Sequence, residues 1–64
     1  MFKILKDFEK KTIDRNLPIA SAIGIARKYV LDGKTSIATV VNEDGSPVFE
    51  AMKIADKMSI RFIK

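Results

Sequence analysis

The sequence predicts a small α+β domain in which one central helix packs on a mostly antiparallel sheet. Three observations support this prediction. The segment 18–32 has the apolar period of an amphipathic helix, between a start signal and a stop signal. The β-rich segments 34–41 and 47–54 flank a strong turn signal, and 58–63 alternates apolar and polar residues. The chain has 64 residues, which is enough for a single domain with one small core.

The central helix is the best-marked element of the chain. Asn16 is expected to cap its N-terminus, because its side-chain oxygen can accept a free backbone N–H of the first turn. Pro18 suits the first helical position, where its missing N–H leaves nothing unpaired. Gly33 is expected to end the helix in the left-handed conformation. The predicted apolar stripe comprises Ile19, Ala22, Ile23, Ile25, Ala26, Tyr29 and Val30.

Gly24 lies off this stripe, in the middle of the predicted helix. A glycine inside a helix costs about 1 kcal/mol relative to alanine. One interpretation is that a second helix packs closely over Ala20, Gly24 and Leu31. The other, which we favour, is a tolerated surface glycine.

Residues 1–16 fit two structures. Strands over 2–6 and 12–14 would form a hairpin, although no glycine or Asn-Gly pair marks the turn. A helix is the alternative, because lysine and glutamate are good helix formers and a loose apolar stripe is present. The stripe is interrupted, and the β-branched residues Thr12 and Ile13 follow each other. We therefore favour the hairpin, which would extend a C-terminal β-meander into a larger sheet.

The turn signal at 42–46 predicts a β-hairpin with Gly45 in the left-handed conformation. If the first and last residues of this turn face each other, Val40 faces Val48 on one side of the sheet. That side also carries a carboxylate, since Ala38 would face Glu50. The opposite side is therefore the better seat for the helix. In this register Phe49 lies there, together with Ile37, Thr39, Val41 and Ala51.

The side away from the helix would then expose an apolar patch. Either the N-terminal segment, if it is helical, or a second subunit is expected to cover this patch. Self-association is also expected because a chain this short gains little net stability from its own core. The predicted self-association residues are Val40, Val48, Met52 and Ile54.

Composition and motifs argue against catalysis. The chain has no cysteine and no histidine, which removes thiolate metal sites, the commonest metal ligand and the commonest general base. Gly33-Lys34-Thr35 resembles the end of a P-loop, but Lys28 stands where the first glycine is required and the helix precedes the loop. Glu43 and Asp44 lack the ligand spacing of a calcium loop. We therefore expect no enzyme activity, no cofactor and no metal ion.

The last twelve residues carry four cations, Lys53, Lys57, Arg61 and Lys64, against one acid. A basic β-surface of this kind can hold nucleic-acid phosphates. The same residues would also protect an edge strand from aggregation. Glu50 is expected to pair with Lys53, with Arg61 or with a partner subunit.

The functional expectation is a non-catalytic binding or regulatory module, acting as a homodimer through a sheet face or edge and able to bind a protein partner. A small nucleic-acid-binding protein is the alternative, with weak affinity because the net charge is only +4. The sequence contains no signal peptide and no apolar run long enough to span a bilayer, so a cytoplasmic location away from membranes is expected. Small proteins of this kind are frequent in phages and mobile elements, although no residue here assigns such an origin.

Overall fold

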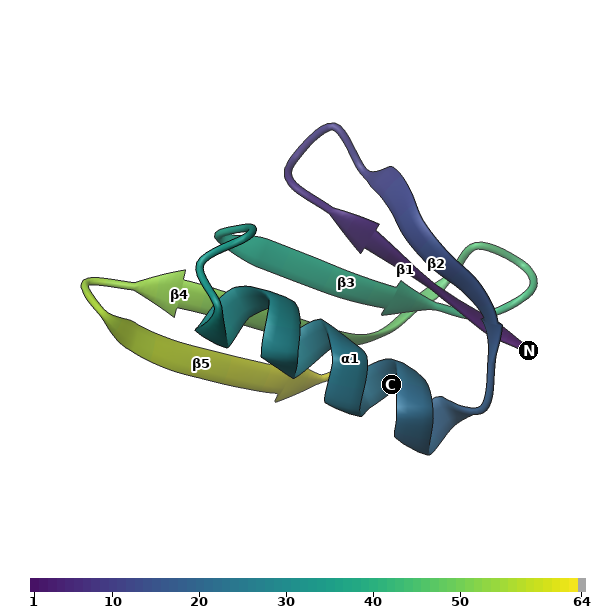
Figure 1. Cartoon of the computed structure of the whole chain (residues 1–64). Helices are drawn as coiled ribbons and strands as arrows, with labels where there is room; N and C mark the ends of the chain where they lie inside the picture. The colour runs from purple at the N-terminus through teal and green to yellow at the C-terminus, as the bar shows by residue number, and fades with distance from the viewer. Residues whose placement is uncertain (64) are drawn as a thin grey trace.

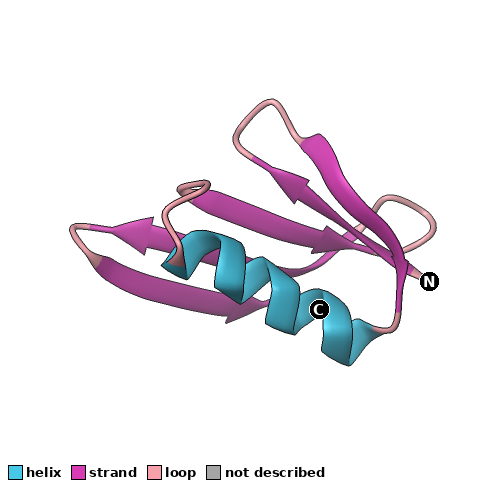
Figure 2. Ribbon diagram, viewed as in Figure 1, coloured by secondary structure: helices cyan, strands magenta, loops and turns pink. Residues whose placement is uncertain are grey.

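The computed structural model describes residues 1–63. Its strands form one antiparallel sheet in the order β2-β1-β3-β4-β5, with α1 across one face over β1, β3 and β4 (Figure 1). Figure 2 shows the two layers, with the helix in front of the strands. The predicted fold class is confirmed. The elements are β1 (Phe2–Lys6), β2 (Lys11–Leu17), α1 (Ile19–Leu31), β3 (Ile37–Val41), β4 (Pro47–Ile54) and β5 (Lys57–Phe62).

The start of α1 differs from the prediction in its capping. Pro18 occupies the N-cap position, with φ −62° and ψ 155°, and makes no side-chain cap. Its carbonyl oxygen accepts the N–H of Ala22 at 2.9 Å, which begins the helical ladder. Asn16 is not the cap: it lies within β2 and has a left-handed backbone, with φ 59°. Its short polar side chain tolerates that conformation, so it serves the bend between strand and helix.

The end of α1 is as predicted. Gly33 is left-handed, with φ 73°. Its N–H donates to the carbonyl of Val30 at 3.1 Å, and the N–H of Lys34 donates to the carbonyl of Tyr29 at 3.0 Å. This pair of bonds is a Schellman motif, which satisfies carbonyls that would otherwise be free at the helix end.

The core lies between α1 and the three strands beneath it. The helix contributes Ala22, Ala26 and Val30, which all belong to the predicted stripe. Alanines occur on both layers and allow the helix backbone to approach the sheet closely, while Phe49 is the largest fully buried side chain. The buried sheet residues in this cluster are Ile4, Ala38, Val40, Phe49 and Ala51.

The predicted register between β3 and β4 is wrong beyond its first pair. Val41 faces Pro47 as expected, but Val40 faces Phe49, so Val48 is the extra residue of a β-bulge. Proline has no N–H to donate to a neighbouring strand, and prolines within sheets are found at edges and bulges for that reason. Because successive side chains point to opposite faces, the shift exchanges the two faces of β3 relative to the prediction.

The bulge decides which side chains lie under the helix. Ala38 faces Ala51, and not Glu50 as predicted, while Ile37 faces Met52. The helix therefore packs on Ala38 and Val40 of β3, and Ile37, Thr39 and Val41 point away from it. Phe49 and Ala51 lie on the helix side of β4, as predicted.

Both predicted hairpins are present. Gly45 is left-handed, with φ 84°, and the turn is closed by the Asn42 N–H, which donates to the Ser46 carbonyl at 2.9 Å. Residues 1–17 form the β1–β2 hairpin, so the helical alternative for the N-terminal segment is wrong. Its turn is built without glycine, since Asp7 and Lys10 adopt positive φ values of 63° and 57°.

The first prediction concerns Gly24 in α1. A Cβ at this position meets no atom within 4 Å, so the Gly24→Ala variant gains helix propensity without a clash. We expect the free energy of unfolding to rise by up to about 1 kcal/mol, measured by urea denaturation. Gly33→Ala is the matched control and should lower the stability, because φ of 73° strains any side chain. Weaker self-association of Gly24→Ala, without a gain in stability, would instead indicate a second helix packed there.

Candidate functional site

The predicted basic surface is divided by the sheet. Lys53 follows Phe49 and Ala51 at alternate positions of β4 and faces Met58, so it lies on the helix side. Lys57 and Arg61 alternate with Met58 on β5 and therefore lie on the opposite side. Lys64 is outside the described residues. The cations that the sequence groups together do not form one surface within residues 1–63.

Arg61 has a partner. It faces Glu50 across β4 and β5, and its guanidinium nitrogen lies 3.3 Å from Oε1 of Glu50. Arg61 was one of the partners predicted for this carboxylate. The Arg61 side chain is 69 % exposed, so the pair adds little to stability. The ion pair does reduce the positive charge that this side of β5 presents to an anion.

The predicted self-association residues do not share a surface either. Val40 is fully buried under α1 as a result of the β-bulge, which corrects its assignment to an exposed patch. Val48 is half-buried and packs against the core cluster. Met52 and Ile54 lie on the side away from the helix. On that side Ile37 and Val41 of the central strand are buried, at 8 % and 3 % exposure, so the exposed side chain of Ile54, at 59 %, does not continue into an apolar patch across the central strand.

Exposed apolar side chains gather instead on the helix side of β5. Met58, Ile60 and Phe62 point to this side, and we call them the β5 apolar row. Met58 is half-buried, whereas Ile60 is 45 % and Phe62 is 65 % exposed. The ring of Phe62 contacts that of Phe49 edge to face, with 5.1 Å between centroids. The row therefore continues the core outward, beyond the strands that α1 covers.

Sequence reasoning missed this row, although its signal was present. The alternation of Met58, Ile60 and Phe62 with polar residues predicts a strand with one apolar side. Alternation alone does not indicate which strands lie under the helix, so the sequence does not show that this side of the strand is uncovered. The structure places β5 at the edge of the sheet, next to β4 (Figure 1), whereas the main contacts of α1 are with β1, β3 and β4.

The backbone of β5 is also open along its outer edge. The Ile63 N–H donates to the Val48 carbonyl at 3.0 Å, and the Lys53 N–H donates to the Ser36 carbonyl at 2.9 Å on the other side of β4. In an antiparallel ladder the residues of a strand alternate between bonding one neighbour and bonding the other. Ser59 and Arg61 therefore bond toward β4, like Ile63. The N–H and C=O groups of the β5 apolar row point outward.

The opposite edge of the sheet is different. β2 pairs with β1 through two register shifts, and Asn16 bends its backbone with a positive φ. Its exposed side chains are polar: Lys11, Thr12, Arg15 and Asn16. Bulges and charged side chains are the devices by which natural sheets prevent edge-to-edge pairing. β5 is paired with β4 without any register shift, so only one of the two edges carries such protection in its backbone.

The segment that resembles a P-loop has a structural role. Thr35 is buried, and its hydroxyl lies 2.7 Å from Oδ1 of Asp7 and 2.8 Å from the Ile37 carbonyl oxygen. The same hydroxyl oxygen accepts the Ile37 N–H at 3.3 Å. These contacts tie the connection between α1 and β3 to the turn of the β1–β2 hairpin. The loop follows the C-terminal end of a helix, where no free N–H groups point at a phosphate.

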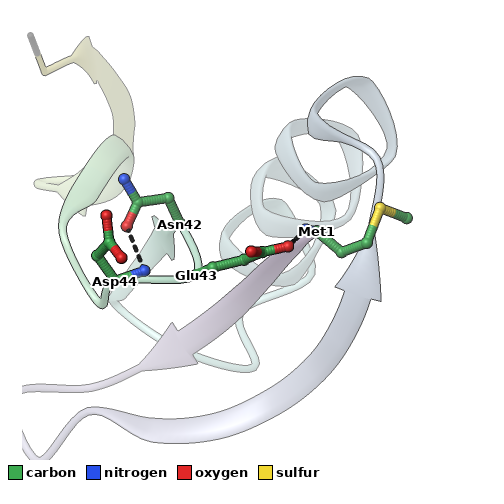
Figure 3. A network of polar contacts seen from close by, with 4 residues as sticks. All are labelled: Met1, Asn42, Glu43 and Asp44. Atoms are coloured by element: carbon green, nitrogen blue, oxygen red, sulfur yellow. Dashed lines mark hydrogen bonds and ion pairs between the residues drawn. The ribbon is translucent and has the colours of Figure 1, made fainter.

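The acidic pair of the β3–β4 turn also has local partners (Figure 3). Asn42 Oδ1 accepts the N–H groups of Asp44 and Ser46, at 3.0 and 2.9 Å, which fixes the turn. The ammonium group of Met1 hydrogen-bonds to the Glu43 carboxylate and lowers the pKa of that carboxyl below its usual value. Within residues 1–63, no three acidic side chains are grouped as a metal ion would require.

A shallow hollow of about 270 Å³ lies beside the C-terminal end of α1. Its most notable contact is internal, since Nζ of Lys34 lies 5.5 Å from the centre of the Tyr29 ring. A hollow of this size is below the usual range for a small-molecule site, about 300–1,000 Å³. The lining residues are Ile25, Lys28, Tyr29, Asp32 and Lys34.

Comparisons of the chain with protein-family models, with curated proteins and with solved structures found no match. Among the described residues, no helix has the length and hydropathy that crossing a bilayer requires. Among the described surfaces, the outer edge of β5 is the most distinctive in its chemistry.

The second prediction concerns the Thr35 contacts. Thr35→Val keeps the shape of the side chain and removes its hydroxyl, so the buried Ile37 N–H and the Asp7 carboxylate each lose a partner. We expect the free energy of unfolding to fall by about 1–3 kcal/mol, measured by urea denaturation. Thr12→Val, at an exposed position of β2, is the control and should stay within about 0.5 kcal/mol of the wild type. Equal stability of both variants would contradict the role assigned to Thr35.

Proposed function

We propose that this protein is a non-catalytic binding module that acts as a homodimer through the edge of its sheet. The observation that carries the proposal is the edge strand β5, which combines the β5 apolar row with unpaired backbone groups. Exposed sheet edges recruit further strands, because each added strand gains main-chain hydrogen bonds and buries side chains on both faces. A protein surface with these two properties is suited to another polypeptide strand.

A second copy of the chain is the occupant that also meets the stability requirement of so small a protein. The core cluster is small and contains four alanines, which bury little apolar area each. Domains of this length without disulfides or metal ions commonly gain stability by oligomerising. Burial of Ile60 and Phe62 at an interface would add apolar area directly beside Phe49, the largest core residue.

The alternative function, nucleic-acid binding, has less support. Lys53 lies on one side of the sheet, and Lys57 and Arg61 on the other, where Glu50 offsets part of the charge. Duplex binding depends on several cations that reach phosphates from one surface. A divided set of this kind supports no more than weak and salt-sensitive contact with polyanions.

The third prediction tests the homodimer by sedimentation velocity over a dilution series. The wild type should show a dimer whose fraction falls on dilution. Phe62→Ser should shift the equilibrium toward the monomer, because the largest exposed side chain of the row is lost. Phe8→Ser is the matched control: Phe8 is 85 % exposed but lies in the β1–β2 turn, so its removal should leave the equilibrium unchanged.

Ile60→Ser provides a second variant, because Phe62 also contacts Phe49 and its loss affects folding as well as assembly. Circular dichroism should show that this variant keeps the helix while it dissociates. A wild type that stays monomeric at millimolar concentration would contradict the proposed function. Equal dissociation of the Phe8 and Phe62 variants would show that β5 is not the contact.

A further inference from the structure

We infer that β5 pairs with β5 of a second copy, antiparallel, about a twofold axis that lies midway between Ile60 of one copy and Ile60 of the other. The two sheets would thereby join into one continuous sheet, with both helices on the same side. This inference rests on the proposed function and adds the partner strand, the direction of pairing and the register. Three independent features of β5 select this arrangement: its backbone, its apolar side chains and its charges.

The backbone restricts the possible registers. A twofold axis perpendicular to the sheet pairs residues that point to the same side, so one residue of β5 must face its own copy directly across the axis. The outward N–H and C=O groups belong to Met58, Ile60 and Phe62. If Ile60 faces Ile60 of the second copy, Met58 faces Phe62. Each of these pairs can exchange two main-chain hydrogen bonds.

The side chains are self-complementary in the same register. Met58, Ile60 and Phe62 form one apolar row on the helix side, and the twofold axis sets this row against itself in reverse order. Cross-strand apolar pairs of this kind stabilise antiparallel sheets. The exposed parts of Ile60 and Phe62 become buried between the two copies. A register in which Met58 or Phe62 faces its own copy would leave much of each strand unpaired.

Charge excludes the two nearest alternatives. A register in which Ser59 faces its own copy would set Lys57 against Arg61 of the second copy, and one in which Arg61 is central would set that residue against itself. Like charges directly opposite each other destabilise a sheet. In the register in which Ile60 faces its own copy, Arg61 faces Ser59 and Lys57 faces Ile63. Arg61 also keeps Glu50 as its partner within each copy.

Disulfide trapping with single cysteines tests this register. The chain has no cysteine, so each variant carries one thiol. In Ile60→Cys the two thiols lie opposite each other at a Cα separation of about 5.5 Å, within the range that a disulfide bridges. We expect this variant to form a covalent dimer under mild oxidation at least about tenfold faster than Ser59→Cys or Arg61→Cys, whose thiols are displaced along the strand.

The outcomes separate the register from the function. A wild-type dimer in which Ser59→Cys or Arg61→Cys is trapped fastest would overturn the inferred register and leave the proposed function standing. A dimer in which none of the three is trapped would place the interface away from β5. A monomeric wild type with no trapping would refute both the inference and the proposed function.

Proline substitutions supply a readout that does not depend on oxidation. Ile60→Pro removes an outward N–H, which proline tolerates at a sheet edge, so the variant should fold and sediment as a monomer. Ser59→Pro removes an N–H that bonds toward β4 and should instead lower the unfolding midpoint. If Ile60→Pro folds and still forms the dimer, the pairing of β5 with a second β5 is wrong.

Discussion

One helix is too narrow to cover five strands, and this constraint shapes the molecule. An α-helix with its side chains is about 10–12 Å wide, and neighbouring strands lie about 4.8 Å apart. A single helix therefore covers two or three strands, and α1 lies over β1, β3 and β4. The core forms beneath it and includes Ala22 and Ala26 of the helix together with Ala38, Ala51 and Phe49 of the sheet. Both edge strands extend beyond this cover.

The two edge strands differ in the regularity of their backbones and in their exposed side chains. β2 is bulged, bent and polar along its exposed positions, which makes it a poor template for another strand. β5 is regular and presents Ile60 and Phe62, with their backbone groups directed outward. The cations of β5, Lys57 and Arg61, lie on its other side, so its helix side and its regular backbone are left open to a second strand, which supports a function of this edge in association.

The features that local signals specify were predictable from the sequence. Gly33 and Gly45 mark a helix end and a turn through their own backbone preferences, and both are left-handed as expected. The register was not predicted correctly, because the bulge at Val48 depends on how the side chains of β3 and β4 pack under the helix, which the turn signal between the two strands does not specify. The same limit applies to the candidate site. The alternation of apolar and polar residues predicts which side chains of β5 share a side, but only the strand order shows that Ile60 and Phe62 are uncovered.

Amide hydrogen exchange, followed residue by residue by NMR at several protein concentrations, tests the central claim most directly. The outward N–H groups of Met58, Ile60 and Phe62 should be protected at high concentration and should exchange rapidly on dilution. Those of Ser59 and Arg61, which bond toward β4, should be protected throughout. Rapid exchange of the three outward groups at every concentration would contradict the account, because it would mean that β5 remains an unpaired edge.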